Sequence, residues 1–183
     1  MSERQFVFKT KTSNVAQKAQ EYLKSLWLSK LTNIERMSET GIPKSYHNLH
    51  HFISDSPWDG FKLMDTISSE VSRSLPARKL TGLHLDESGV RKKGSYSVGV
   101  SPQYCGNLGK IDNCQVAVYA SLNNGDFASL VDSRLYLPKQ WITDKNRCEK
   151  AKIPHEHRIF KTKQELALEM IRHQIDLGVN FDY

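Results

Sequence analysis

Apolar residues in the first third of the chain recur at helical spacing. One such stripe comprises Val15, Ala19, Tyr22, Leu23 and Leu26. Intervals of three or four residues place these side chains on one face of a helix. The pattern therefore predicts a helix that buries this face against other parts of the protein.

Three further helices are expected in the same region. Thr32 and Glu35 have capping-box spacing, which predicts the start of a short helix. The segment YHNLHHFIS, residues 46–54, predicts the next one. A last helix is expected to begin at Ser56-Pro57 and to run to about Arg73, because serine and proline favour the first positions of helices.

From about residue 79 the hydrophobic pattern changes to alternation, which is typical of strands. In the segment LTGLHLDES, Leu83 and Leu85 alternate with His84 and Asp86. Tyr96, Val98 and Val100 alternate in the same way within SYSVGV. Two further strands are expected, over residues 114–122 and 127–137.

The last two of these strands are expected to form a hairpin. Asn123, Asn124 and Gly125 separate them, and Asn-Gly is a strong hairpin signal. In the second strand Val131, Ser133, Leu135 and Leu137 are expected on one face, opposite Asp132, Arg134 and Tyr136. The alternating region thus predicts three or four antiparallel strands that end at Pro138.

The remaining residues predict two helices. A polar helix is expected over residues 144–150. A longer one begins with the capping box of Thr162 and Glu165 and ends near Gly178. Its apolar stripe consists of Leu166, Met170, Ile171 and Ile175. Together the patterns predict an α+β chain, with a helical region over residues 1–78 and a second region over 79–183.

Composition and charge narrow the class of protein. Among 183 residues, 26 Lys and Arg against 20 Asp and Glu give a formal net charge of +6, which suits a nucleic-acid partner. The longest apolar run, Val116–Ala120, is far shorter than the roughly 20 residues that a spanning helix needs. An odd number of cysteines without an export signal indicates reduced thiols and a cytoplasmic location.

Asp86 is the first candidate for chemistry. It is expected at the end of an apolar strand, where carboxylates often hold Mg²⁺ in phosphoryl-transfer enzymes. The alternative is an ordinary aspartate before a turn at Gly89. Arg91, Lys92 and Lys93 follow, and they suit a phosphate backbone or, alternatively, a solvated turn.

Two other groups of residues favour a structural interpretation. His47, His50 and His51 have no carboxylate or cysteine at zinc-protein spacing, so an exposed helix face is expected. Cys114 is expected in the core of a strand, and Cys105 in an open loop. A basic metalloenzyme that uses Asp86 and the histidines remains a separate hypothesis.

The stretch from Asp86 to Leu122 strongly resembles the DDE transposases of the insertion-sequence 701 family. The matching motifs are Asp86-Glu87-Ser88, Lys93-Gly94, Ser97–Val100, Gln103–Gly106 and Asn113–Val116. RLYLP at residues 134–138, the helix entry KTKQELAL and the upstream HHFISDSPWD are also similar. The resemblance covers the chain from roughly residue 20 to its end.

The resemblance implies an RNase H-like catalytic core that acts in DNA transposition. In such enzymes two aspartates and a glutamate hold two divalent ions, Mg²⁺ or Mn²⁺, and water and then a DNA 3′-hydroxyl attack a phosphodiester. Asp86 matches the first aspartate and is the expected catalytic residue and metal ligand. Glu87 and Ser88 depart mildly from the family pattern. Arg91, Lys92 and Lys93 are the expected DNA-binding residues.

The end of the sequence departs from the family in one respect. The segment Gly178–Phe181 is present, but the family's second aspartate and its glutamate lie farther along than Tyr183. We therefore expect an N-terminal transposase fragment with an incomplete RNase H-like mixed sheet, inactive by itself and without a stably bound metal ion. Its expected partners are transposon-end DNA and a second copy or an intact transposase. The alternative is a non-enzymatic DNA-binding regulator of that transposase.

Overall fold

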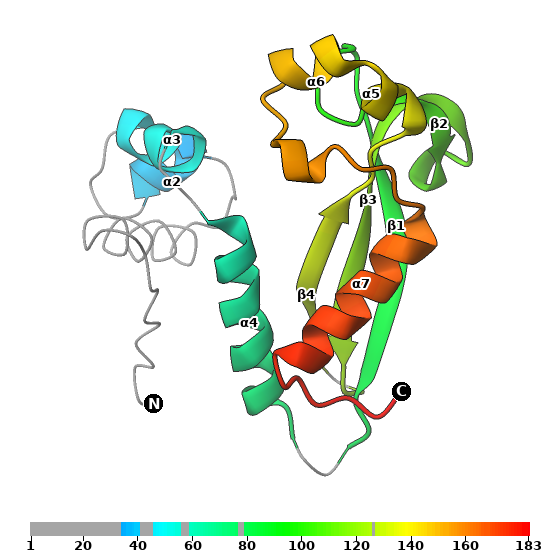
Figure 1. Ribbon diagram of the computed structural model, residues 1–183. Helices are drawn as coiled ribbons and strands as arrows, with labels where there is room; N and C mark the ends of the chain where they lie inside the picture. The colour runs from blue at the N-terminus through cyan, green and yellow to red at the C-terminus, as the bar shows by residue number, and fades with distance from the viewer. Residues whose placement is uncertain (1–33, 41–45, 56–58, 77–78, 126) are drawn as a thin grey trace. The chain divides into compact units, whose positions relative to one another are not determined.

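The computed structural model describes residues 34–40, 46–55, 59–76, 79–125 and 127–183 (Figure 1). The chain divides into two compact units, Met1–Leu63 and Met64–Tyr183. The helix predicted around residues 15–26, the capping residue Thr32 and the pair Ser56-Pro57 lie outside the described residues.

Among the described residues of the first unit, two short helices precede α4 (Gly60–Ser74). Helix α2 spans Ile34–Thr40 and α3 spans Tyr46–Ser54, which confirms the bounds predicted for residues 46–54. The side chains of Met37, Leu49 and Phe52 are buried. His47, His50 and His51 lie exposed on α3, as expected for a surface face.

Helix α4 spans Gly60–Ser74 and begins later than predicted. Asp59, rather than Ser56, precedes its first residue, and Asp59 Oδ1 accepts a hydrogen bond from the Lys62 N–H at 3.1 Å. An aspartate in this position satisfies one of the amides that a helix start leaves without a partner. The prediction of a start at Ser56-Pro57 was therefore wrong by about three residues.

A four-stranded antiparallel sheet forms the centre of the second unit, which confirms the α+β class. Its strands are β1 (Gly82–Arg91), β2 (Ser101–Cys105), β3 (Lys110–Asn123) and β4 (Ala128–Leu135). The long β3 pairs with β1 over residues 114–123 along one edge. Along the other edge it pairs with β2 over residues 110–114 and with β4 over residues 117–123.

The segment SYSVGV is a loop and not a strand, contrary to the prediction. Gly99 has a φ of +77°, and a side chain there would lie 2.8 Å from the carbonyl oxygen of Tyr136. The Val100 N–H also donates to the Ser97 carbonyl at 3.1 Å, which closes a turn. A left-handed glycine within a turn interrupts the extended backbone that a strand requires.

Strand β4 contains a bulge that the alternation did not reveal. Ser121 pairs with Leu130 and Ala120 with Asp132, so Val131 is an additional residue. Val131 and Asp132 are both buried, whereas Leu135 is exposed. Because a bulge changes the phase of side-chain alternation, the predicted grouping of Val131 with Ser133 and Leu135 was wrong.

The hairpin between β3 and β4 is confirmed. Gly125 has a φ of +71°, and its N–H donates to Asn123 Oδ1 at 2.9 Å. The fully buried Asn124 side chain donates to the Lys79 carbonyl at 2.9 Å and to Thr81 Oγ1 at 2.8 Å. The turn therefore also fixes the segment that leads into β1.

Of the three α-helices after the sheet, the last two agree with the sequence prediction and the first was not predicted. Helix α5 spans Lys139–Thr143, and α6, which spans Lys145–Lys150, is capped by the Asp144 side chain. Helix α7 spans Lys163–Asp176 and begins with the predicted capping box of Thr162 and Glu165. Short 3₁₀ turns, η1 and η2, occupy Gly106–Leu108 and His155–His157.

The main core lies between one sheet face and two helices, α7 and the second half of α4 (Figure 1). Its buried residues are Val118, Ala120, Leu122, Val131, Leu166, Met170 and Val179. On α7 the buried position after Met170 is Gln174, while Ile175 is 58% exposed, so the predicted apolar stripe is wrong at its end. None of the described helices is long and apolar enough to cross a membrane.

The C-terminal residues lie beside the start of β1. The Asp182 N–H donates to the Thr81 carbonyl at 2.7 Å, and the Leu83 N–H donates to the Tyr183 carbonyl at 2.8 Å. The two segments run in the same direction, as neighbours in a mixed sheet would. The arrangement of helices and strands is consistent with a partial RNase H-like fold.

Candidate active site

Asp86 lies in the middle of β1 and not at its end. β1 continues to Arg91, and Asp86 pairs with Tyr119 of β3. The turn at Gly89, which the alternative interpretation of Asp86 assumed, is absent from this strand, because residues 87–91 stay paired with the long β3. Gly89 instead leaves room for the Cys105 side chain, because a Cβ atom at position 89 would lie 3.1 Å from the Cys105 sulfur.

Asp86 and Glu87 point to opposite faces of the sheet, because successive strand residues alternate. Glu87 pairs with the buried Val118 and shares the face that α7 covers. Its Oε2 lies 2.6 Å from Lys163 Nζ at the first residue of α7. The carboxylate of Glu87 is therefore neutralised in the fold and joins β1 to α7.

Asp86 lies on the other face and is exposed. Its Oδ1 accepts a hydrogen bond from the Glu87 N–H at 2.8 Å. His84 and Ser88 share its face by strand alternation, and the His84 ring contacts the Tyr183 ring edge-on at 6.1 Å. Asp86 thus has a carboxylate accessible to an incoming ligand.

This face does not complete a metal site from the described residues. Across the ranges that the structure describes, no three His, Cys, Asp or Glu side chains gather closely enough to hold a metal ion. A two-ion site needs several carboxylates. Asp86 could supply one ligand, and the residues around it do not provide the rest.

The predicted DNA-binding residues lie at the far end of β1 from its start. Arg91 Nε is 3.4 Å from Asp112 Oδ2. The two residues are far apart in the sequence, and the pairing of β1 with β3 brings them close together. Lys92 is half-buried, and its backbone exchanges hydrogen bonds with Asn113. Lys93 is exposed. Five residues of strand, about 17 Å, separate Asp86 from Arg91.

The cysteines are not placed as nucleophiles. Cys105 ends β2 and is fully buried, so its predicted position in an open loop was wrong. Cys114 is buried, as predicted, and burial raises the pKa of its thiol, with the neighbouring Cys105 adding to the rise. A raised pKa disfavours the reactive thiolate.

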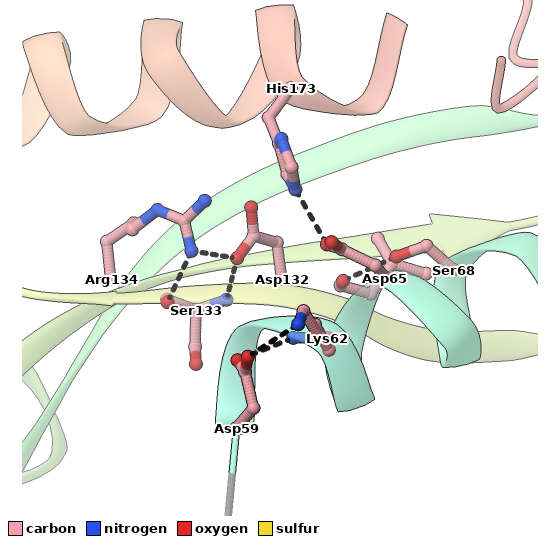
Figure 2. A network of polar contacts seen from close by, with 9 residues as sticks. Asp59, Lys62, Asp65, Ser68, Asp132, Ser133, Arg134 and His173 are labelled. Carbon is pink, nitrogen blue, oxygen red and sulfur yellow. Dashed lines mark hydrogen bonds and ion pairs between the residues drawn. The ribbon is translucent and has the colours of Figure 1, made fainter. Parts of the chain in front are cut away.

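A second polar cluster, which the sequence did not reveal, occupies the opposite sheet face (Figure 2). His173 Nε2 on α7 lies 2.7 Å from Asp65 Oδ1 on α4. Asp132 on β4 is 1% exposed, and its Oδ1 accepts hydrogen bonds from Arg134 at 2.6 Å and from the Ser133 N–H at 2.7 Å. The contact of His173 with Asp65 joins α7 to α4 across 108 residues. Ser68 Oγ on α4 donates to the Val131 carbonyl of β4 at 2.7 Å and joins these two elements.

Burial raises the pKa of Asp132, and the nearby Asp65 adds to the rise. Arg134, the Ser133 N–H and His173 act in the opposite direction. Asp132 Oδ2 has no hydrogen-bond partner among the described residues. Asp132 is the buried member of this cluster, while the His173 and Asp65 side chains are each 33% exposed, and the sheet separates the cluster from Asp86.

Comparisons with known proteins agree with the resemblance. Residues 11–183 match the family model for the DDE superfamily endonuclease. The chain is 30% identical over 169 residues to the probable transposase for insertion sequence element IS701 from Microchaete diplosiphon. The match covers 88% of this chain and 40% of that relative, so the chain spans less than half of the relative's length. No solved structure matches the chain.

Proposed function

This chain belongs to the DDE superfamily endonuclease family, and from that membership we propose that it is the DNA-binding N-terminal part of a transposase. Asp86 is then one carboxylate ligand of a divalent-metal site. One observation carries the choice of Asp86 over Glu87: Glu87 is paired with Lys163 at 2.6 Å, whereas Asp86 is exposed on the other face.

A divalent ion in such a site would stabilise the charge that develops on an attacked phosphodiester. The described residues supply only part of its ligand set. The chain by itself is therefore inactive in DNA cleavage, and its own contribution is to bind DNA and present Asp86. A region that supplies the remaining carboxylates, from the same polypeptide or from another, would complete the site.

Incubation of a supercoiled plasmid with Mg²⁺ or Mn²⁺ and the purified chain tests this proposal. We expect the wild type and Asp86→Ala to give the same background of nicked plasmid. Glu87→Gln is the matched control, since it removes the adjacent carboxylate. Nicking that requires Asp86 but not Glu87 would contradict the inactivity of the chain and would support Asp86 as the ligand.

Replacement of both Lys92 and Lys93 by alanine should weaken binding to duplex DNA of any sequence. The logarithm of the binding constant falls with the logarithm of salt concentration, and each lost phosphate contact makes this slope shallower by about 0.9. The slope of the double variant should therefore be shallower by about 1.8. Fluorescence anisotropy of labelled duplex DNA at several salt concentrations measures this slope.

The control for this prediction is Lys62→Ala with Arg73→Ala. These two residues lie on α4 and form exposed ion pairs with Asp59 and Glu70, so the double variant loses the same charge elsewhere. We expect its slope to equal that of the wild type. An equal loss of slope in both double variants would show that net charge, and not Lys92 and Lys93, controls binding.

A further inference from the structure

The loop over residues 92–100 exposes an aromatic side chain almost completely. Tyr96 is 93% exposed, more than any other large apolar or aromatic side chain in the described part of the chain. A ring in this position contributes no burial to folding. Loops held on a rigid scaffold are where binding residues are concentrated.

Helices α5 and α6 hold this loop at Ser95 and at Val100 (Figure 1). Arg147 Nη2 donates to the Ser95 carbonyl at 2.6 Å, and Trp141 Nε1 donates to the Val100 carbonyl at 2.8 Å. The Arg147 guanidinium also stacks 3.7 Å from the centre of the Trp141 ring. Trp141 is fully buried, so these donors have fixed positions.

Strand β3 holds the loop from another side. Asn113 Nδ2 donates to the carbonyls of Lys92 at 2.7 Å and Gly94 at 3.0 Å. Gln115 Nε2 donates to the Val98 carbonyl at 2.6 Å. The backbone on both sides of Tyr96 is therefore fixed before any ligand binds, which lowers the entropic cost of binding.

The charge around Tyr96 indicates the kind of ligand. Lys92 and Lys93 precede it closely, and the sequence between Arg91 and Lys110 contains no acidic residue. Asp112, which strand pairing brings close to Arg91, is itself paired with Arg91 and Lys110. Exposed aromatic rings beside cationic side chains are the combination that binds unpaired nucleic acid, because bases stack on the ring while the cations contact phosphates. An acidic peptide would use the cations but would leave the ring without a stacking partner.

We propose that the loop over residues 92–100 binds unpaired DNA, with a base stacked on Tyr96 and a flanking phosphate held by Lys93. This inference rests on the proposed function, because it takes DNA as the partner, and it adds the form of DNA that the loop recognises.

Fluorescence anisotropy with a labelled single-stranded oligothymidylate and a labelled duplex of equal length tests the proposal. We expect Tyr96→Ala to weaken single-strand binding by about 5-fold to 100-fold, from the energy of one base–aromatic stack. Duplex binding should change by less than about 2-fold, since phosphate contacts dominate it. Tyr96→Phe keeps the ring and should bind like the wild type. Circular dichroism verifies that each variant is folded.

The outcomes separate this inference from the proposed function. Wild-type chain that binds neither DNA would overturn both. Wild-type chain that binds DNA, with Tyr96→Ala unchanged on the single strand, would overturn only the stacking role. An equal loss on both DNAs would also overturn it, because the ring would then contribute nothing specific to unpaired bases.

Discussion

Replacement of Asp132 by alanine is expected to lower the free energy of unfolding by about 3 kcal/mol, because it leaves the Arg134 guanidinium without its carboxylate in a buried setting. The two atoms joined by this pair, Arg134 Nη1 and Asp132 Oδ1, are 2.6 Å apart, with side-chain exposures of 18% and 2%. The value is at the lower end for a buried pair, since Arg134 can reach some water. Urea denaturation followed by circular dichroism measures the change.

Asp132→Asn is the matched control, because the amide oxygen can still accept hydrogen bonds from Arg134 and from the Ser133 N–H. Its loss of stability should be smaller than that of the alanine variant. Equal losses in the two variants would show that the charge, rather than the acceptor atom, stabilises this cluster.

A comparison of the wild type with Asp132→Asn also gives a prediction about pH. Burial raises the pKa of Asp132 above its ordinary value of 3.8, so the folded state holds this proton more tightly than the unfolded state. As pH rises from the pKa of Asp132 in the unfolded state to its raised pKa in the folded state, the wild type should therefore lose stability relative to Asp132→Asn. Stability curves that remain parallel through this window would contradict the raised pKa.

Replacement of Trp141 by alanine is expected to lower the free energy of unfolding by about 4 kcal/mol, from the loss of a large buried side chain and the cavity left behind. Trp141 is fully buried in a cluster with Val100, Cys148 and Ile153. It also supplies the 2.8 Å hydrogen bond to the Val100 carbonyl. Urea denaturation measured by circular dichroism gives the change without relying on tryptophan fluorescence.

Trp141→Phe separates the two contributions of this residue. Phenylalanine fills most of the volume but donates no hydrogen bond, so we expect a loss of about 2 kcal/mol. Arg147 Nη2 still lies 3.3 Å from the Val100 carbonyl and partly satisfies it. A phenylalanine variant as unstable as the alanine variant would show that the hydrogen bond dominates.

Local signals in the sequence predicted most of the individual elements. The capping box at Thr162 and Glu165 and the Asn-Gly turn at residues 124–125 involve residues close in sequence, and both are present in the structure. Helix α3 has its predicted bounds for the same reason. Elements determined by neighbouring residues can be predicted from one sequence, because no distant contact has to be known.

The errors in the fold have non-local causes. The segment SYSVGV over residues 95–100 alternates like a strand, but Gly99 lies against the Tyr136 carbonyl and Arg147 binds the Ser95 carbonyl. Asp86 was expected at the end of its strand, but pairing with the long β3 extends this strand to Arg91. Strand alternation alone does not show which distant segment will bind the backbone.

In the candidate site, too, contacts between distant residues could not be predicted from the sequence. The strand pattern made Asp86 a candidate, but an ordinary aspartate also fits that pattern, and the family resemblance was what favoured Asp86 as a metal ligand. The choice between Asp86 and Glu87 depends on Lys163, 76 residues from Glu87, and their contact exists only in the folded chain. The pair His173 and Asp65 likewise could not be inferred, because nothing in either helix indicates the other.

The extra residue at Val131 has a consequence for comparing this protein with its relatives. It reverses which alternate positions of β4 face the interior, so that a carboxylate at position 132 lies inside while the apolar Leu135 faces outward. In a relative that lacks this extra residue, the opposite set of alternate positions in β4 would face the interior. Residue types along the rest of the strand would then have to change for the same kinds of side chain to lie inside. An alignment gap at this point would therefore mark a reorganised interior, and not a harmless change of length.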